Sequence, residues 1–441
     1  MKTIKQLKLA AAVAAGLALV GCGSDDDSSD STSGTDLYTE TVARSACFSA
    51  NTCSASGFDF PEGAVFVAAD AQTGDDITAA IDTALFNATP GQTLVLPKGT
   101  FKVDTTILID DTSKHNDLTF VGHGIKSTTL DFSDCSSCED GVRFEGVQDV
   151  VIRDMSVNEA GKNGIKAVNV DGIHFNYTAT VWEGELTLET ESAYGLYPVE
   201  SDNIVIENSY AKGSNDAGIY VGQSNDIVVR NNIAEYNIAG IEIENSNRAD
   251  VYNNIATRNS GGLLSFDLPG TNQKFGLNTR WFNNKSYDNN TPNVGPGTVG
   301  QVPTGTGILV LATSDVEIYN NEIYDNKTNA VSISSYFLIE GNEAAYGPEG
   351  DLFGDILGGW TPLTQNVQVH DNVFTNNTYS PETDSLVGEA IGAYITGNHF
   401  SSVVAVMAGG EAFPINFPTI IYDGVGEQVA NSNAFAALGM L

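Results

Sequence analysis

Residues 196–262 repeat one pattern three times, as LYPVESDNIVIENSYAKGSNDAG, IYVGQSNDIVVRNNIAEYNIAG and IEIENSNRADVYNNIATRNSGG. The repeats begin at Leu196, Ile219 and Ile241, so the period is 22 to 23 residues. Each repeat contains short runs in which apolar and polar residues alternate, and each run ends in Asn, Gly or Ser. A period of this length with two-residue alternation is typical of an all-β solenoid in which one repeat forms one coil.

Stacked coils place equivalent residues of successive repeats above one another, because parallel strands pair about 4.8 Å apart. The spacing therefore predicts two internal aliphatic columns: Ile219, Ile241, Ile308 and Val331 in the first, and Val221, Ile243, Val310 and Ile333 in the second. Asparagines recur at two corners of each coil, where stacked side-chain amides can bond along a ladder. These structural asparagines are Asn232, Asn254 and Asn321 at one corner, and Asn237, Asn259 and Asn326 at the next.

The first residues have the pattern of an export signal, with Lys2, Lys5 and Lys8 followed by an apolar run too short for a membrane span. The run ends in Leu-Val-Gly-Cys at residues 19–22, which resembles the bacterial lipobox. That resemblance implies acylation of Cys22, and Gly23 after it favours the outer membrane. The alternative is an ordinary signal peptide that happens to contain a cysteine.

Composition divides the chain into five predicted parts. Residues 1–21 are a signal peptide, residues 22–57 a flexible tether with a cysteine loop, and residues 58–117 a cap with the first strands. In the cap, Ile77, Ile81 and Leu85 fall on one face of an amphipathic helix that would cover the end of the solenoid. We expect about ten coils over residues 118–400 and a C-terminal cap over residues 401–441.

The chain is strongly acidic, with 56 acidic and 20 basic residues and a net charge of −36. Loss of the signal peptide removes three lysines and takes the net charge to about −39. This charge argues against direct binding of nucleic acid or of anionic lipid. Where the repeat spacing lengthens, we expect loops that shape a binding surface, near residues 178–194, 267–306, 344–365 and 376–388.

Four cysteines remain besides Cys22. Cys47, Cys53, Cys135 and Cys138 predict two disulfides in an exported protein, most simply 47–53 and 135–138. A redox or metal-binding pair is the alternative. The five histidines are scattered over different coils with no ligand spacing, so the sequence predicts neither a metal nor another cofactor.

Candidate catalytic residues lie on the outward side of the first strand of each coil. Tyr197, Tyr220, Glu242 and Glu244, with Glu200 nearby, would form an aromatic and acidic patch able to hold a sugar and exchange a proton. A solvated strand face is the alternative interpretation. For lyase chemistry a cation must neutralise the sugar carboxylate, and Lys166 and Arg280 are the candidates.

The coils and capping segment resemble the right-handed parallel β-helix superfamily, which includes pectate lyases and alginate-modifying enzymes. Residues 194–259 distantly resemble the periplasmic alginate C5-epimerase, although Val199 stands in place of its catalytic base and Gln223 in place of its arginine. Over the whole chain the sequence resembles an exported, often lipidated family of tandem β-helix proteins of unassigned activity. Three segments carry that likeness: YGLYPVES at residues 194–201, FDLPG at 266–270 and PTGTGI at 303–308. Membership would imply a right-handed, single-stranded parallel β-helix and an exported protein partner.

These observations predict a lipid-anchored cell-envelope protein that binds polysaccharide or a partner protein on its coil face and loops. It would be held on the periplasmic or surface side of the outer membrane through Cys22. The alternative is a polysaccharide lyase, epimerase or hydrolase acting on an acidic glycan.

Overall fold

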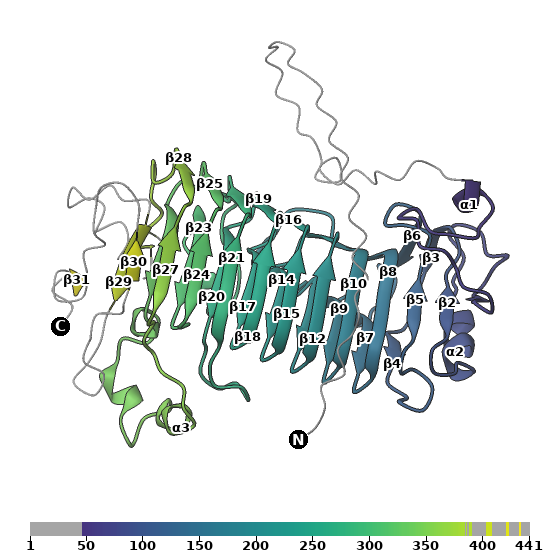
Figure 1. The fold of residues 1–441 in the computed structure, drawn as a ribbon, viewed down its shortest axis with the longest axis horizontal. Helices are drawn as coiled ribbons and strands as arrows, with labels where there is room; N and C mark the ends of the chain where they lie inside the picture. The colour runs from purple at the N-terminus through teal and green to yellow at the C-terminus, as the bar shows by residue number, and fades with distance from the viewer. Residues whose placement is uncertain are drawn as a thin grey trace, which may run out of the picture.

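The computed structural model describes residues 46–383, 385, 388–389, 403–407, 420–422 and 432–433. Within these residues the chain winds into coils that stack side by side along one rod (Figure 1). The predicted signal peptide, Cys22 and most of the predicted C-terminal cap lie outside the described residues.

One face of the rod is an 11-stranded parallel sheet, here called the site sheet. Its strand order is β31-β29-β26-β23-β20-β17-β14-β11-β9-β7-β4. The strands are β4 (Ile107–Ile109), β7 (Asp140–Glu145), β9 (Asn163–Val168), β11 (Leu196–Val199), β14 (Ala217–Gly222), β17 (Ala239–Glu244), β20 (Gly261–Phe266), β23 (Thr306–Leu311), β26 (Asn329–Ser334), β29 (Val403–Met407) and β31 (Ser432–Asn433).

The remaining strands form a 20-stranded sheet made of two parallel runs. The long strands β8 and β10 join the runs, because β10 pairs with both β12 and β13. The first run contains β1 (Val65–Phe66), β2 (Thr93–Val95), β5 (Thr119–Val121), β8 (Gln148–Asn158), β10 (Asp171–Val181), β12 (Asp202–Glu207), β15 (Asn225–Arg230), β18 (Asn247–Tyr252), β21 (Leu277–Phe282), β24 (Val316–Tyr319), β27 (Val367–His370) and β30 (Ile420–Tyr422). The second run adds β3 (Gly99–Lys102), β6 (Thr128–Asp131), β13 (Tyr210–Lys212), β16 (Ile233–Glu235), β19 (Ile255–Thr257), β22 (Lys285–Tyr287), β25 (Glu322–Tyr324) and β28 (Val373–Thr375).

The helices are short and lie outside the coils. They are α1 (Ala46–Ser49), α2 (Thr78–Phe86), α3 (Phe353–Leu357) and the 3-10 turns η2 (Val299–Gln301), η3 (Tyr336–Leu338) and η4 (Glu343–Tyr346). Ile81 and Leu85 of α2 are buried in the main core at the N-terminal end of the rod, together with Ile77. None of the helices in the described part of the chain combines the length and apolar character that crossing a membrane requires.

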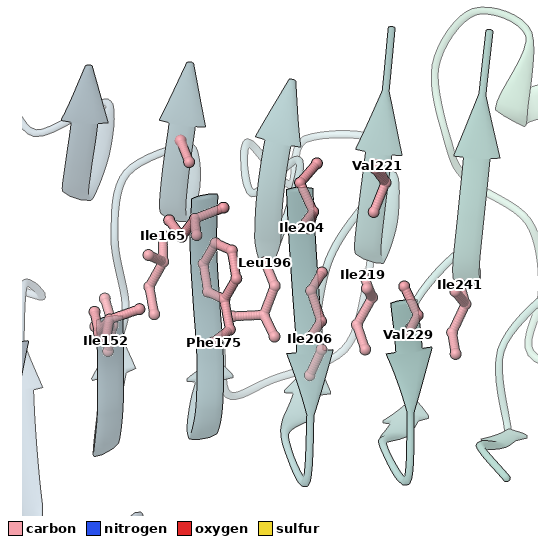
Figure 2. Packing of buried hydrophobic residues seen from close by; sticks show 14 of the residues in the cluster. Ile152, Ile165, Phe175, Leu196, Ile204, Ile206, Ile219, Val221, Val229 and Ile241 are labelled. Carbon is pink, nitrogen blue, oxygen red and sulfur yellow. The ribbon is translucent and has the colours of Figure 1, made fainter. Parts of the chain in front are cut away.

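The core columns have the register that the repeat predicts. Ile219 pairs with Ile241, and Val221 with Ile243, and all four side chains are at most 2% exposed. Figure 2 shows such side chains pointing from facing strands into the space between them, with Val229 opposite Ile219 and Ile241. This register and burial confirm the prediction of a stacked parallel solenoid. Each fully buried aliphatic side chain in these columns contributes on the order of 1.5–3 kcal/mol to its stability.

The asparagine ladders run through more coils than the sequence period shows. Asn232 donates its backbone and side-chain N–H to Asn254 Oδ1, and Asn254 bonds in the same way to Asn284. Asn284 continues to Asn321, and Asn321 to Asn372. The two added members were missed because insertions separate them from the regular spacing.

One predicted insertion is wrong in extent. Residues 267–306 contain β21 and β22, which continue the 20-stranded sheet, so the coil leaves the rod only over residues 267–276 and 288–305. Trp281, expected in a projecting loop, is fully buried in the core and donates its indole N–H to Ser265 Oγ at 2.9 Å.

The four cysteines form two local disulfides. Cys47 is bonded to Cys53, and Cys135 to Cys138. Both members of the second pair lie in the main core cluster, where they fasten the turn after β6.

Candidate functional site

The candidate residues lie on the outward side of the site sheet, where they alternate with the core columns. Lys166 on β9 pairs in register with Tyr197 on β11, and Tyr220 on β14 pairs with Glu242 on β17. The register of β11 and β14 sets Tyr197 beside Tyr220, with ring centroids 5.1 Å apart. The parallel coils therefore bring together residues that are far apart in the sequence.

Most of this face is covered, which contradicts the alternative interpretation of a solvated strand face. Tyr220 is 4% exposed, Glu242 3% and Glu244 9%. The covering segments are residues 182–195, 267–276, 288–305 and 335–366, here called the loop cover. Figure 1 shows the part around α3 projecting from one side of the rod.

The loop cover and the sheet face share a second hydrophobic core, outside the solenoid. Leu264 and Leu309 supply its floor, and Val299 and Val302 lie over them. All four of its covering segments contribute apolar side chains: Leu186, Leu268, Val294, Val299, Val302, Tyr336 and Ile339.

Four carboxyl groups lie in or beside this second core: Asp216, Glu242, Glu244 and Asp267, here called the acid cluster. Tyr220 donates its hydroxyl to Glu244 Oε1 at 2.8 Å. Asp216 is hydrogen-bonded to Tyr194, whose ring packs against Tyr197 and Tyr220 at centroid distances of 4.4 and 4.5 Å. Glu242 Oε2 is buried without a hydrogen-bond partner.

Burial raises the pKa of all four acids, and it brings those of two of them, Glu244 and Asp216, close to neutral pH. The pKa of Glu244 rises to about 7, although the bond from Tyr220 opposes the shift. The pKa of Asp216 also rises to about 7. Burial, followed by the charges of Asp216 and Glu244, holds the pKa of Glu242 well above its ordinary value. Strongly perturbed acids grouped in this way are typical of sites that transfer protons.

The N-terminal end of the cluster, on β9 and β11, is partly open to solvent, since the outward side chains there are less buried than Tyr220 and Glu242. Lys166 Nζ lies 4.9 Å from the centre of the Tyr197 ring, and both side chains are only partly buried. Within the described residues Lys166 has no ion-pair partner, whereas neighbouring Arg143 is paired with Asp140 and Glu145. An unpaired cation in so acidic a protein is available to bind an anion.

The other predicted residues do not join the cluster. Glu200 lies in the turn after β11, where it accepts a hydrogen bond from Asn272 of the loop cover. Arg280, proposed as a neutralising cation, is on β21 of the other sheet and is paired with Asp250 at 2.7 Å. Sequence reasoning missed Asp216 and Asp267, since both lie outside the alternating runs: Asp216 directly precedes β14, and Asp267 directly follows β20.

Apart from the site sheet, a groove of about 600 Å³ lies on the 20-stranded sheet. Its lining includes Arg248 and Arg280, which already bond bidentately to Asp226 and Asp250. Alongside runs a row of stacked rings, with neighbouring centroids 4.7 to 5.3 Å apart: Tyr252, Phe282, Tyr319 and His370. Because each ring stacks on the next, the row does not offer open faces to a sugar.

The described part of the chain offers little that could hold a metal ion. The one group of three ligand-type side chains found there is Cys47, Cys53 and Asp59, and the two cysteines are joined in a disulfide. The acid cluster does not bring three carboxylates within ligating distance of one another.

Known proteins agree with this architecture. A family model described as a right handed beta helix region matches residues 128–279. The fold is a right-handed parallel β-helix. The chain matches no curated protein sequence significantly.

Three solved β-helix structures illustrate the likeness. The A-module of the mannuronan C-5 epimerase of Azotobacter vinelandii matches with a TM-score of 0.51 and 16% identity, over 83% of this chain and 98% of that one. An alginate lyase from a Paenibacillus species matches with a TM-score of 0.33 and 13% identity, over 80% of this chain and 96% of that one. A Streptomyces thermodiastaticus alpha-1,3-glucanase catalytic unit matches with a TM-score of 0.47 and 14% identity, over 79% and 51%. At 16% identity the comparison with the epimerase A-module shows the fold alone.

Proposed function

We propose that this β-helix protein binds an acidic polysaccharide at the open end of the site sheet. Lys166 would pair with a sugar carboxylate, while the Tyr197 ring packs against the sugar. The observation that carries the proposal is the unpaired Lys166 beside Tyr197, in a chain with 56 acidic and 20 basic residues. A ligand anion would take the place of the protein carboxylate that this lysine lacks.

Two further features support a glycan as the ligand. Tyr194 and Tyr197 give partly exposed aromatic surface next to the cation, and polar groups and aromatic rings together suit a ring that carries hydroxyls. The A-module of a mannuronan epimerase shares this fold, which agrees with the proposal without establishing it.

Replacement of Lys166 tests the proposal. We expect Lys166→Met to weaken binding of a polyuronate such as alginate by about 10- to 100-fold, because a charge-assisted hydrogen bond contributes about 1.5–3 kcal/mol. The measurement is affinity electrophoresis or calorimetry on the soluble protein beginning at residue 37. Lys285→Met is the matched control, since Lys285 lies on β22 and is paired with Glu322.

Equal loss of binding in both variants would indicate only a general charge effect. The proposal would be contradicted if the Lys166 variant bound the polyuronate as tightly as the wild-type protein does. It would also be contradicted if the wild-type protein bound a neutral glucan as tightly as the polyuronate.

The raised acid pKa values favour turnover of the glycan as a second candidate function. In a β-elimination, a base removes the proton next to the sugar carboxylate and the bond to the glycosidic oxygen breaks. The released sugar keeps that oxygen, which takes a proton from water to become a hydroxyl, and the other product carries a carbon–carbon double bond. At neutral pH Glu244, with its pKa near 7, is partly ionised and can accept this proton, whereas Tyr197, whose pKa burial raises to about 12, is protonated and cannot. Ultraviolet absorbance of the unsaturated product distinguishes turnover from binding.

We further propose that the rod is held on the outer membrane by acylation of Cys22, with an exported protein as a second partner. The anchor is proposed from the sequence of residues 19–22, and the partner from the family resemblance that residues 194–201, 266–270 and 303–308 carry. The variant Cys22→Ala should lose incorporation of labelled palmitate and leave the membrane fraction, because acyl chains supply the membrane affinity. Full membrane retention of the unlabelled variant would contradict the anchor, and cross-linking from the wild-type protein would identify a protein partner.

A further inference from the structure

We propose that the acid cluster is a pH-sensitive latch for the loop cover: while its carboxyl groups are protonated they remain buried beneath the cover, and their ionisation releases it. This inference concerns the conformation of the free protein and does not rest on the proposed glycan. It assigns a role to the buried acids that the open Lys166–Tyr197 site leaves unused.

The acids lie where ionisation of a carboxyl group is energetically unfavourable. Glu242 is 3% exposed, and its Oε2 has no hydrogen-bond partner. Its neighbour in register on β20 is Leu264, which packs in the second core with Val299 and Val302 of the loop cover. An unpartnered oxygen in apolar surroundings tolerates a protonated carboxyl group far better than a carboxylate.

The cations near the acid cluster do not neutralise its carboxylates when these ionise. On the sheet side, Arg143 is paired with Asp140 and Glu145, and Lys166 lies over Tyr197. In the loop cover, Lys274 is paired with Asp355 at 2.7 Å. The other ionisable groups on the packed elements are acids or phenols: Glu183, Glu185, Glu189, Glu191, Tyr194, Tyr197, Glu200, Tyr220, Asp288, Tyr336, Glu340, Glu343, Tyr346, Glu349 and Asp351.

The cover is attached at the cluster itself. Asp267 begins the segment 267–276, and its Oδ2 accepts the backbone N–H of Gly276 at 2.9 Å. Its backbone carbonyl accepts the indole N–H of Trp360, at the far end of the cover, at 3.0 Å. Movement at the acid cluster is therefore transmitted to the segments that lie over it.

The sign of the pH dependence follows from the raised acid pKa values. Ordinary values are 3.8 for Asp and 4.5 for Glu, and in the covered state those of Asp216 and Glu244 are about 7. The covered state therefore binds more protons than the open state between these limits. Its stability is greatest below the ordinary values and falls as the pH rises through about 7, where Asp216 and Glu244 ionise.

Hydrogen exchange followed by mass spectrometry at about pH 5 and about pH 8, which lie below and above the raised pKa of about 7, tests the latch. Exchange is corrected for its intrinsic pH dependence and compared with peptides from β15 and β18 on the other sheet. We expect peptides of residues 288–305 and 335–366 to open at least about tenfold more often at the higher pH, since one titrating group alone changes an equilibrium about tenfold per pH unit.

The variant Glu242→Gln/Glu244→Gln mimics two of the protonated acids and should reduce this pH effect by at least about threefold, while Asp216 and Asp267 carry what remains. Glu317→Gln, on β24 of the other sheet, should leave the effect intact. Protection of the β15 and β18 peptides shows that each variant is folded, and Glu244→Gln alone replaces the double variant if it is not. A wild-type cover whose corrected exchange does not change with pH overturns the latch. So does a folded glutamine variant with the wild-type pH dependence.

Discussion

Ile243→Asp should prevent the chain from folding. Ile243 is 2% exposed and lies in the second internal column, between Val221 and Ser265 of the adjacent coils. A carboxylate there would lie unpaired among the apolar side chains of the main core, and the coils on both sides depend on the same column. We expect a loss of more than about 5 kcal/mol, comparable with the whole stability of a typical domain. The measurement is soluble yield with the circular-dichroism melt.

Leu108→Asp is the matched control for Ile243→Asp. Leu108 also lies on the site sheet, in β4, but its side chain is 42% exposed and its partner in register is Arg143. We expect it to cost less than about 1 kcal/mol. Glu242, which the sequence pattern places on a solvated face, is too deeply buried to serve as this control. Similar melts for Ile243→Asp and Leu108→Asp would contradict the register.

Asn254→Ala should destabilise the protein by about 3 to 4 kcal/mol, the second large effect. Asn254 Oδ1 accepts two N–H groups from Asn232, and its Nδ2 donates to Val229 and Asn284. Truncation leaves several buried donors and acceptors unsatisfied at once, and each one costs about 1–3 kcal/mol before the structure relaxes. Chemical denaturation monitored by circular dichroism measures the difference.

Asn225→Ala is the control that tests whether the effect at Asn254 depends on burial of the ladder. Asn225 belongs to a similar row, donating to Asp202 and accepting from Asn247, but it is only partly buried. Water can replace its bonds, so we expect a loss of less than about 1 kcal/mol. Equal destabilisation by the two substitutions would mean that the buried ladder contributes no more than the exposed one.

The acid cluster and the open end of the site sheet differ in how a ligand can reach them. Lys166 and Tyr197 are accessible in the structure, so glycan binding there requires no rearrangement. Glu242 and Glu244 are reached only when the loop cover moves. Binding and turnover can therefore depend differently on pH, and a glycan that binds with the cover closed would meet the acids only in the open state.

The repeat in the sequence determined the solenoid, its register and the direction of each side chain. This was possible because the strand period and the coil period are local: Ile219, Ile241 and Val331 identify the inward column wherever the spacing is regular. The same regularity located the first asparagine ladder. It failed for Asn284, Asn372 and Trp281, where insertions shift the numbering but leave the stacking unchanged.

Only the tertiary structure decided what happens to the outward face. The alternating pattern shows that Tyr220, Glu242 and Glu244 point away from the solenoid core, but solvent and a covering loop are both outside that core. The cover is closed by contacts between distant residues, such as Trp360 with Asp267, 93 positions apart. The insertions that make these contacts have no period from which to infer where they fold. Burial beneath them turns ordinary surface acids into groups with a pKa near 7, because desolvation depends on what lies above a side chain and not on the residues beside it in the sequence.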